Sequence, residues 1–179
     1  MVIVVKPSPS ADSRTADKNR KISFEEFSKS TDMHREDVKN MMDEIARMIQ
    51  EAGEKHDWTK KEKEKEFYNS FTAAKEEGKD FKKDNWYRYH TRTERHHIAS
   101  YVHNDINLLD VIEMICDCCC AGYARSGKVY DIDIDDDVLK KAYENTVKLI
   151  LINHILITLI LLVIQKFLYF FEFFVYSIK

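Results

Sequence analysis

The chain has 179 residues, with 28 basic and 31 acidic side chains and a formal net charge of −3. One folded domain is the usual content of a chain of this length, and the charge balance gives no electrostatic case for nucleic acid as the main partner. Only 2 prolines and 4 glycines occur. Because a β-rich fold needs turn residues between its short strands, this composition favours long helices.

The first predicted segments are a disordered lead and a long helix. Residues 1–22 are polar and contain both prolines, so we expect them to be disordered. A helix is predicted from a cap at Thr31 or Asp32 as far as Gly53, because its apolar residues recur at spacings of three and four. His34 lies four residues before Val38, which predicts that it shares the buried face of this helix.

Four further helices are predicted downstream. The second begins near His56 and runs to residue 71 or beyond, and the third covers residues 81–90. The fourth is capped by Asn104 or Asp105 and ends at about residue 125, and the fifth follows a cap within residues 135–137. Residues 129–134 alternate apolar and acidic side chains, a pattern compatible with one edge strand.

The cysteines form a single short stretch and lie too close in sequence for ordinary disulfides with one another. A reducing, cytoplasmic location is therefore expected. A zinc site is not the leading interpretation, because the paired Cys-x-x-Cys spacing is missing. We interpret Cys116, together with Cys120 or Cys119, as small core residues. The cysteines of this stretch are Cys116, Cys118, Cys119 and Cys120.

Most of the histidines precede an acidic helix, an order that favours a metal site. Neutral imidazole is the commonest metal ligand near neutral pH, and carboxylates complete such sites. Asp110, Glu113 and Asp117 are spaced by three and four residues and therefore share one helical face. The other interpretation is that Asp57 only caps a helix and that these acids form a solvated face. The histidines of this region are His34, His56, His90, His96, His97 and His103.

The string His56-Asp57-Trp58-Thr59-Lys60 resembles the His-Asp-x-x-Lys motif of the HD superfamily of metal-dependent phosphohydrolases. The later histidines are similar to the additional ligands of the multi-metal members. The resemblance implies an all-α, HD-like helical bundle of about five core helices over residues 23–150, followed by an apolar C-terminal helix. Asp105 and Asp117 stay open as alternatives for the final acidic ligand. The metal ligands that the resemblance implies are His34, His56, Asp57, His90, His96, His97 and Asp110.

Residues 34–149 also resemble a family of short phage and bacterial proteins of unknown function. The strings that carry this resemblance are Asn107–Met114, Ala121–Gly127 and Asn145–Val147. The resemblance makes the histidine string a family feature and implies no particular reaction.

The function expected from these patterns is metal-dependent hydrolysis of a nucleotide or another phosphate ester. The cofactor would be a divalent metal (Mn, Mg, Fe or Zn) that generates hydroxide from bound water. Asp57 and Lys60 would be catalytic, and Lys60 and Arg95 would offset the charge of the substrate phosphate. Two alternatives remain: a non-catalytic helical interaction protein whose histidines are structural or only bind metal, and a tail-anchored membrane protein.

The last part of the chain, residues 151–179, is predicted to be an apolar tail. A membrane span needs about 20 apolar residues, and a window of that length places Lys166 near its centre. Three interpretations follow for residues 149–178: a C-terminal membrane anchor, a packed helix or homo-oligomer contact, and an abnormal end produced by A/T-rich reading-frame run-on.

Overall fold

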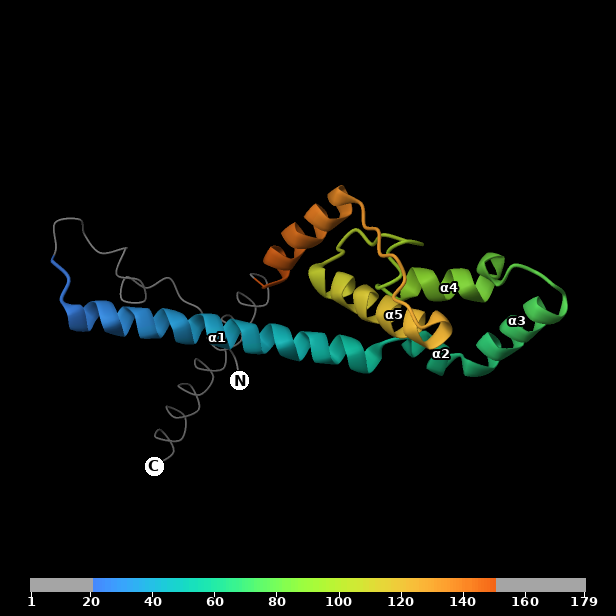
Figure 1. Cartoon of the computed structure of the whole chain (residues 1–179), viewed down its shortest axis with the longest axis horizontal. Coiled ribbons are helices and arrows are strands. Elements are labelled where there is room, and N and C mark those ends of the chain that lie inside the picture. The colour runs from blue at the N-terminus through green and yellow to red at the C-terminus, as the bar shows by residue number, and fades with distance from the viewer. Residues whose placement is uncertain (1–20, 151–179) are drawn as a thin grey trace, which may run out of the picture. The chain divides into compact units, whose positions relative to one another are not determined.

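The computed structural model describes residues 21–150, which contain no strand. The all-α prediction is therefore confirmed for this part of the chain (Figure 1). A further helix begins at residue 136 and continues to the end of the described residues. The helices are α1 (Phe24–Lys55), α2 (Trp58–Glu62), α3 (Glu64–Glu76), the 3₁₀ helix η2 (Phe81–Lys83), α4 (Asn85–Thr93) and α5 (Leu108–Ser126).

The chain divides into two compact units. Among the described residues, the first comprises residues 21–46 and 148–150, and the second comprises residues 47–147. The second unit holds the buried core and the polar cluster described below.

Helix α1 begins at Phe24 rather than near Thr31, because a capping box precedes it. The Ser23 hydroxyl accepts a hydrogen bond from the Glu26 amide at 3.1 Å, and the Glu26 carboxylate accepts one from the Ser23 amide at 3.0 Å. This reciprocal pair satisfies two backbone donors that a helix start otherwise leaves unpaired. The helix also continues through Gly53, which lacks the positive φ found at Gly78 and Gly127.

The buried face predicted for the first half of this helix is wrong for His34. Its side chain is exposed, as is that of Val38, which keeps 49% of its accessible surface. The apolar spacing alone therefore did not identify a buried face here.

The predicted second and third helices are each divided in two. The backbone at Lys63 leaves the helical region, at φ −115° and ψ 39°, and separates α2 from α3. Before α4, the Asp84 carboxylate accepts a hydrogen bond from the Trp86 amide at 2.7 Å and caps the helix, while η2 precedes it with its own cap at Asp80. Asp84 therefore ends η2 and starts α4 at a point where the periodicity alone predicts one continuous helix.

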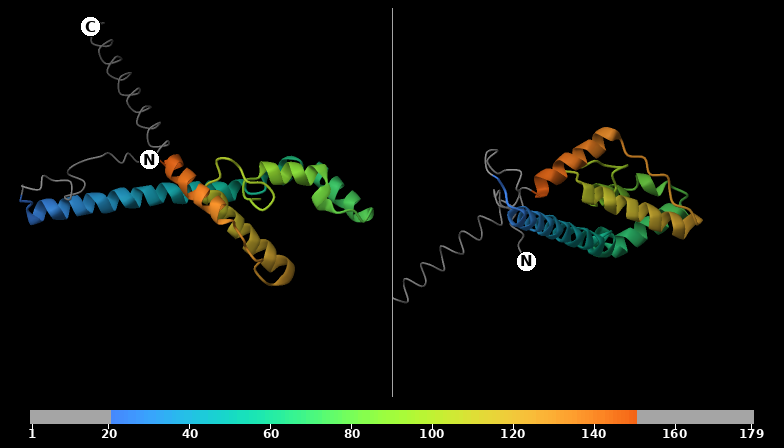
Figure 2. Two further views of the ribbon diagram at one scale, coloured as in Figure 1. Left: turned by 90° about the horizontal axis from the view of Figure 1, so that it is seen from above. Right: turned by 60° about the vertical axis from the view of Figure 1, so that its left-hand side comes forward.

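Helix α5 agrees most closely with its prediction. Its cap is Asn107 rather than the predicted Asn104 or Asp105, because the Asp110 side chain bonds back to the Asn107 amide in a capping box. Gly127 ends it in the left-handed conformation, at φ 69°. The chain then turns back, and the helix from residue 136 lies beside α5 (Figures 1 and 2). The buried core between them consists of Ile98, Ile106, Val111, Met114 and Ala142.

The cysteines on α5 differ in burial. Cys118 packs against the core, whereas Cys116 and Cys120 are exposed. The interpretation of Cys116 and Cys120 as core residues is therefore wrong, because both lie on another side of the helix.

Residues 129–134 do not form the predicted edge strand. Ile132 and Ile134 pack against the core from an irregular segment. This segment approaches α5 at Gly122, where a Cβ atom would lie 2.5 Å from the Lys128 carbonyl oxygen and 2.8 Å from the Tyr130 amide nitrogen. The absence of a side chain at position 122 therefore lets the segment pack on the helix.

Within residues 21–150, no helix has the length and apolar character needed to cross a membrane. The predicted apolar tail, residues 151–179, and residues 1–20 of the predicted disordered lead lie outside the described residues.

The close approach at Gly122 gives a stability prediction. Gly122→Ala should lower the free energy of unfolding by about 1–3 kcal/mol, because backbone atoms must move to admit the methyl group. The matched control is Gly53→Ala, where an added Cβ meets nothing within 4 Å and where alanine should stabilise the helix by up to ~1 kcal/mol. Urea denaturation of both variants measures the two effects, and equal stabilisation by both substitutions would contradict the packing described at Gly122.

Candidate metal centre

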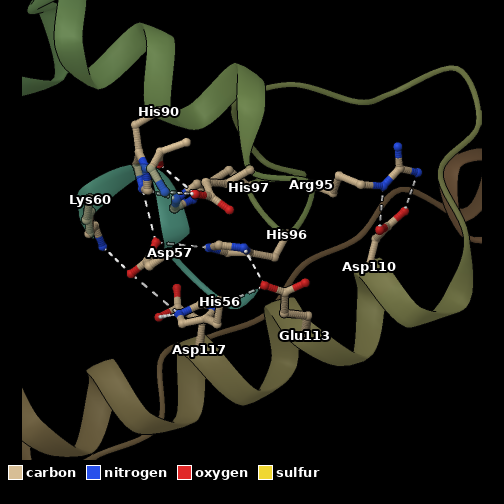
Figure 3. Close-up of polar contacts among 12 residues, drawn as sticks. His56, Asp57, Lys60, His90, Arg95, His96, His97, Asp110, Glu113 and Asp117 are labelled. Carbon is tan, nitrogen blue, oxygen red and sulfur yellow. Dashed lines mark hydrogen bonds and ion pairs between the residues drawn. The ribbon is translucent and has the colours of Figure 1, made fainter. Parts of the chain in front are cut away.

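The dipeptide His56-Asp57 forms the link between α1 and α2. Asp57 adopts the left-handed conformation, with φ 57° and ψ 27°, and is the only non-glycine residue of the described chain with a positive φ. Such a backbone costs of order 1–3 kcal/mol and is held in place only by its surroundings. Aspartate tolerates it better than most residues. The turn directs the Asp57 carboxylate toward the histidines of α4 and of the following loop (Figure 3).

Side chains from three parts of the chain converge on Asp57 (Figure 3). Its Oδ1 atom lies 3.3 Å from His90 Nε2 on α4 and 3.7 Å from His96 Nε2 in the loop after α4. His56 Nδ1 and His96 Nδ1 each lie 2.9 Å from the same Glu113 oxygen, Oε1, on α5. We call the whole group the histidine–carboxylate cluster; it consists of His56, Asp57, His90, His96, His97, Glu113 and Asp117.

A buried hydrogen-bond chain orients His90. The Thr59 hydroxyl donates to Glu94 Oε1 at 2.6 Å and lies 2.6 Å from His90 Nδ1. Because that hydroxyl proton is committed to Glu94, the Thr59 oxygen must accept the proton carried by His90 Nδ1. In neutral His90 this leaves Nε2 as a lone pair directed toward Asp57. Carboxylate–hydroxyl–imidazole chains of this kind fix the tautomer of metal-binding histidines.

His97 adds a second imidazole beside His90. The two Nε2 atoms are 2.8 Å apart. Burial, together with the neighbouring His96 and His90, lowers the pKa of His97 to about 3. His97 is therefore neutral at pH 7 and offers a ring nitrogen to the interior of the cluster.

His96 is the least satisfied polar group of the cluster. Only 2% of it is exposed, and neither ring nitrogen has a hydrogen-bond partner among the described residues. Glu113 Oε1 is close to its Nδ1, but the angle is not that of a hydrogen bond. Asp57 Oδ1 is also buried without a hydrogen-bond partner. Buried polar atoms are rarely left unpaired, so these atoms are arranged like ligands directed at a common point.

The electrostatics of the cluster favour positive charge. The carboxylates of Asp117 and then Glu113 raise the pKa of His56 to about 10, against the opposing effect of burial. Burial by itself would raise the pKa of Glu113, but the adjacent imidazoles of His56 and His96 outweigh it and lower that pKa to about 2. For Asp57, burial is likewise outweighed by the adjacent His90 and Lys60, which hold its pKa well below the ordinary value.

The ligand atoms form overlapping groups that fit a cation. Each group offers ligand atoms that all lie within 4.8 Å of one another, and His96 and Asp57 belong to more than one group. The unpaired atoms of His96 and Asp57 lie in these groups, so the residues present fit a metal ion. Among the described residues the groups are His56/His96/Glu113, Asp57/His96/His97 and Asp57/His90/Glu94.

Two of the residues expected as ligands lie elsewhere. His34 is exposed on α1 and belongs to the other compact unit. Asp110 accepts two hydrogen bonds from Arg95, from Nε at 2.8 Å and from Nη2 at 2.9 Å, and also caps α5. Arg95 further bonds Asp105, so its guanidinium is occupied by this pair of acids rather than directed into the cluster. The acids that meet the histidines are the two that follow Asp110 on the same helical face.

Three residues that shape the site had unequal signals in the sequence. Glu113 lies three residues after Asp110 on the predicted acidic face, so the spacing could have identified it as a ligand. Glu94 and Thr59 act through His90, and no spacing rule connects residues 35 apart in sequence. Only their burial in the fold reveals them: Thr59 is fully buried and Glu94 is 4% exposed.

The Thr59 hydroxyl gives a test of this orientation. Thr59→Val preserves the shape but leaves His90 Nδ1 unpaired, which should lower the free energy of unfolding by about 1–3 kcal/mol. Thr59→Ser keeps the hydroxyl and should retain most of that stability. Nitrogen-15 NMR of the ring should show protonated Nδ1 at His90 in the native protein and in Thr59→Ser. A native His90 with unprotonated Nδ1 would contradict the assigned tautomer.

Comparison with known proteins identifies a family for this chain, and that family has no known activity. Residues 23–155 match the family of unknown function DUF5662. No curated protein and no solved structure matches the chain. The matched span contains the entire histidine–carboxylate cluster and covers well over half of the 179 residues, so the chain belongs to the DUF5662 family.

Proposed function

We propose that the histidine–carboxylate cluster holds a divalent metal and that the protein is a metal-dependent phosphohydrolase related in mechanism to the HD superfamily. The observation that carries the proposal is His96, which is buried with both ring nitrogens unpaired beside the equally unpaired Asp57 Oδ1. A buried imidazole in that state loses hydrogen bonds that water would supply. A cation at this point would pair with these atoms.

The donor set indicates which metals would suit the site. Imidazole nitrogens and carboxylate oxygens together suit Zn, Fe and Mn, whereas sites made of oxygen alone suit Mg and Ca. His56, Asp57, His90 and His96 would provide the inner ligands, with Glu113 and Asp117 within reach on α5. Such a metal supplies Lewis-acid polarisation and a bound water whose pKa is lowered toward ~7.

In this proposal, Lys60 binds the substrate phosphate. Its ammonium group pairs with Asp57, one helical turn away, and 36% of its side chain is exposed. It lies beside Asp57 at the edge of the cluster, so a bound phosphate would meet this ammonium group next to the ligands. Arg95 was also expected to bind phosphate, but its bonds to Asp110 and Asp105 give it a structural role.

A second candidate function has its own supporting observation. The raised pKa of His56 lets a proton, rather than a metal, neutralise Glu113 and Asp117. In that case the cluster would be a structural network of a helical interaction protein. The two candidates differ in metal content and in proton release.

Metal analysis of the purified full chain tests the first candidate. His96→Ala should weaken metal binding by roughly tenfold or more, since loss of even an outer-shell partner costs 10–100-fold. His34→Ala is the matched control, because that histidine is exposed and outside the ligand groups. Circular dichroism checks that both variants are folded. Equal metal content in His96→Ala and the native protein would refute the assignment.

Hydrolysis of p-nitrophenyl phosphate, assayed with Mn²⁺, Mg²⁺, Fe²⁺ and Zn²⁺ in turn, tests the reaction. Lys60→Ala should lower kcat/KM by roughly 100-fold, the usual effect of removing one group that stabilises developing charge. Metal content should persist in this variant, since lysine is not a ligand. A metal-loaded protein with no phosphatase activity on any ester would favour the non-catalytic candidate.

Proton release distinguishes a metal from a proton in the site. With its pKa raised from 6.5 to about 10, His56 contributes stability to the metal-free protein that is complete below pH 6.5 and is lost as the pH rises through 10. A metal ligand must be neutral, so metal binding at pH 7.5 should release this proton. Calorimetric titration with Zn²⁺ in two buffers of different ionisation enthalpy measures the release. Identical heats in both buffers would contradict a protonated His56.

A further inference from the structure

A pocket lies directly beside the histidine–carboxylate cluster in the second compact unit. Its volume is about 270 Å³, and it lies between the end of α1 and one side of α5. His56, Glu113 and Asp117 belong both to the pocket wall and to the cluster. Anything bound in this pocket would therefore touch the groups proposed to hold the metal.

The rest of the pocket wall is apolar. Ile49 and Ala52 line it from α1, and Leu109 and Ile112 line it from α5, with Cys116 and Cys120 along the same side of that helix. Ile49 and Ile112 each leave 37% of their surface exposed. A hollow walled by exposed apolar side chains next to convergent polar groups is the usual form of a small-molecule site.

The charges around the pocket exclude several classes of ligand. Its wall contains the acids Glu113 and Asp117, the imidazole of His56, and no lysine or arginine. A second phosphate or a carboxylate in the pocket would meet two acids of like charge, and His56, the one basic side chain of the wall, is already paired with both of them. A nucleobase would leave its polar ring edges against hydrocarbon, and each unpaired group is costly. An uncharged hydrocarbon group would bring neither the charge repulsion nor the unpaired polar groups.

We propose that this pocket binds the alcohol portion of the substrate and that the substrate is a phosphate monoester of a compact, apolar, uncharged alcohol. The inference rests on the proposed phosphohydrolase function and specifies its substrate class. The pocket volume lies near the lower end of the range of ligand sites, about 300–1,000 Å³. An aromatic ring system or a short branched chain fits these limits better than a nucleotide.

Gly53 is the position at which the pocket can be filled. It lines the pocket from α1, and a Cβ added there meets no atom within 4 Å. Its backbone is helical, so a leucine at this position favours the helix while its side chain occupies the pocket. Glu54→Leu is the matched control, because Glu54 is exposed and does not line the pocket.

Binding can be measured without catalysis through the cysteines. The probe is 1-naphthylmethylphosphonate, whose carbon–phosphorus bond resists hydrolysis, and methylphosphonate is the control with the same head group. On the Mn²⁺-treated full chain, the naphthyl compound should slow alkylation of Cys116 and Cys120 by iodoacetamide. Cys118 and Cys119, which do not line the pocket, are the internal reference. Peptide mapping by mass spectrometry resolves the sites.

The apolar group should make the naphthyl compound bind roughly tenfold or more tightly than methylphosphonate, because it removes apolar surface from water. Gly53→Leu should abolish this difference, and Glu54→Leu should preserve it. In activity assays, Gly53→Leu should lower the ratio of kcat/KM for 1-naphthyl phosphate to that for glycerol 1-phosphate by roughly tenfold.

The outcomes separate the two proposals. Hydrolysis of glycerol 1-phosphate and AMP as efficiently as 1-naphthyl phosphate, with no protection of Cys116 and Cys120, would overturn the substrate class and leave the phosphohydrolase intact. Protection of both cysteines without hydrolysis of any ester would support the pocket and refute the reaction. Equal protection in the native protein and in Gly53→Leu would overturn the assignment of the pocket.

Discussion

The ion pair between Arg95 and Asp110 joins the two halves of the candidate site. Arg95 lies between Glu94 and the pair His96-His97, and Asp110 lies one turn before Glu113 on α5. Two parallel hydrogen bonds fix the guanidinium against the carboxylate in distance and in direction. The loop that carries two histidines is thereby held against the helix that carries two acids.

The rotation of α5 about its own axis then determines both the core and the site. Val111 and Met114 face the core, while Glu113 and Asp117 face the histidines. The capping box at Asn107 and Asp110 sets the first turn and hence this rotation. A helix that serves two environments at once tolerates little change in register, because one residue corresponds to about 100° of rotation.

The parts of the fold that the sequence predicted best are those with local signals. The end of α5 follows from Gly127, and the helical class follows from the scarcity of turn residues. The start of α1 also has a local signal, the Ser23-x-x-Glu26 pattern, although periodicity alone placed it later. The break at Lys63 has no comparable pattern, since the surrounding charged residues suit a continuous helix.

The sequence indicated some members of the candidate site and not others. His56, Asp57, His90, His96 and His97, which were expected as ligands, lie close together in the structure. Asp110 lies on the same face of α5 as Glu113 and Asp117. Sequence spacing cannot show which of these acids will form an ion pair with an arginine from another segment. His34 could not be assigned from spacing either, because an amphipathic pattern does not show whether a partner surface covers it.

The left-handed backbone of Asp57 places two separate demands on one position. The turn accepts only glycine, asparagine or aspartate with ease, and the cluster requires a carboxylate between His90 and His96. Asparagine would satisfy the first demand alone, and glutamate would satisfy the second alone. Each of these substitutions therefore fails one of the two demands, and the conformation of the helix junction itself restricts which side chain can serve at this point of the cluster.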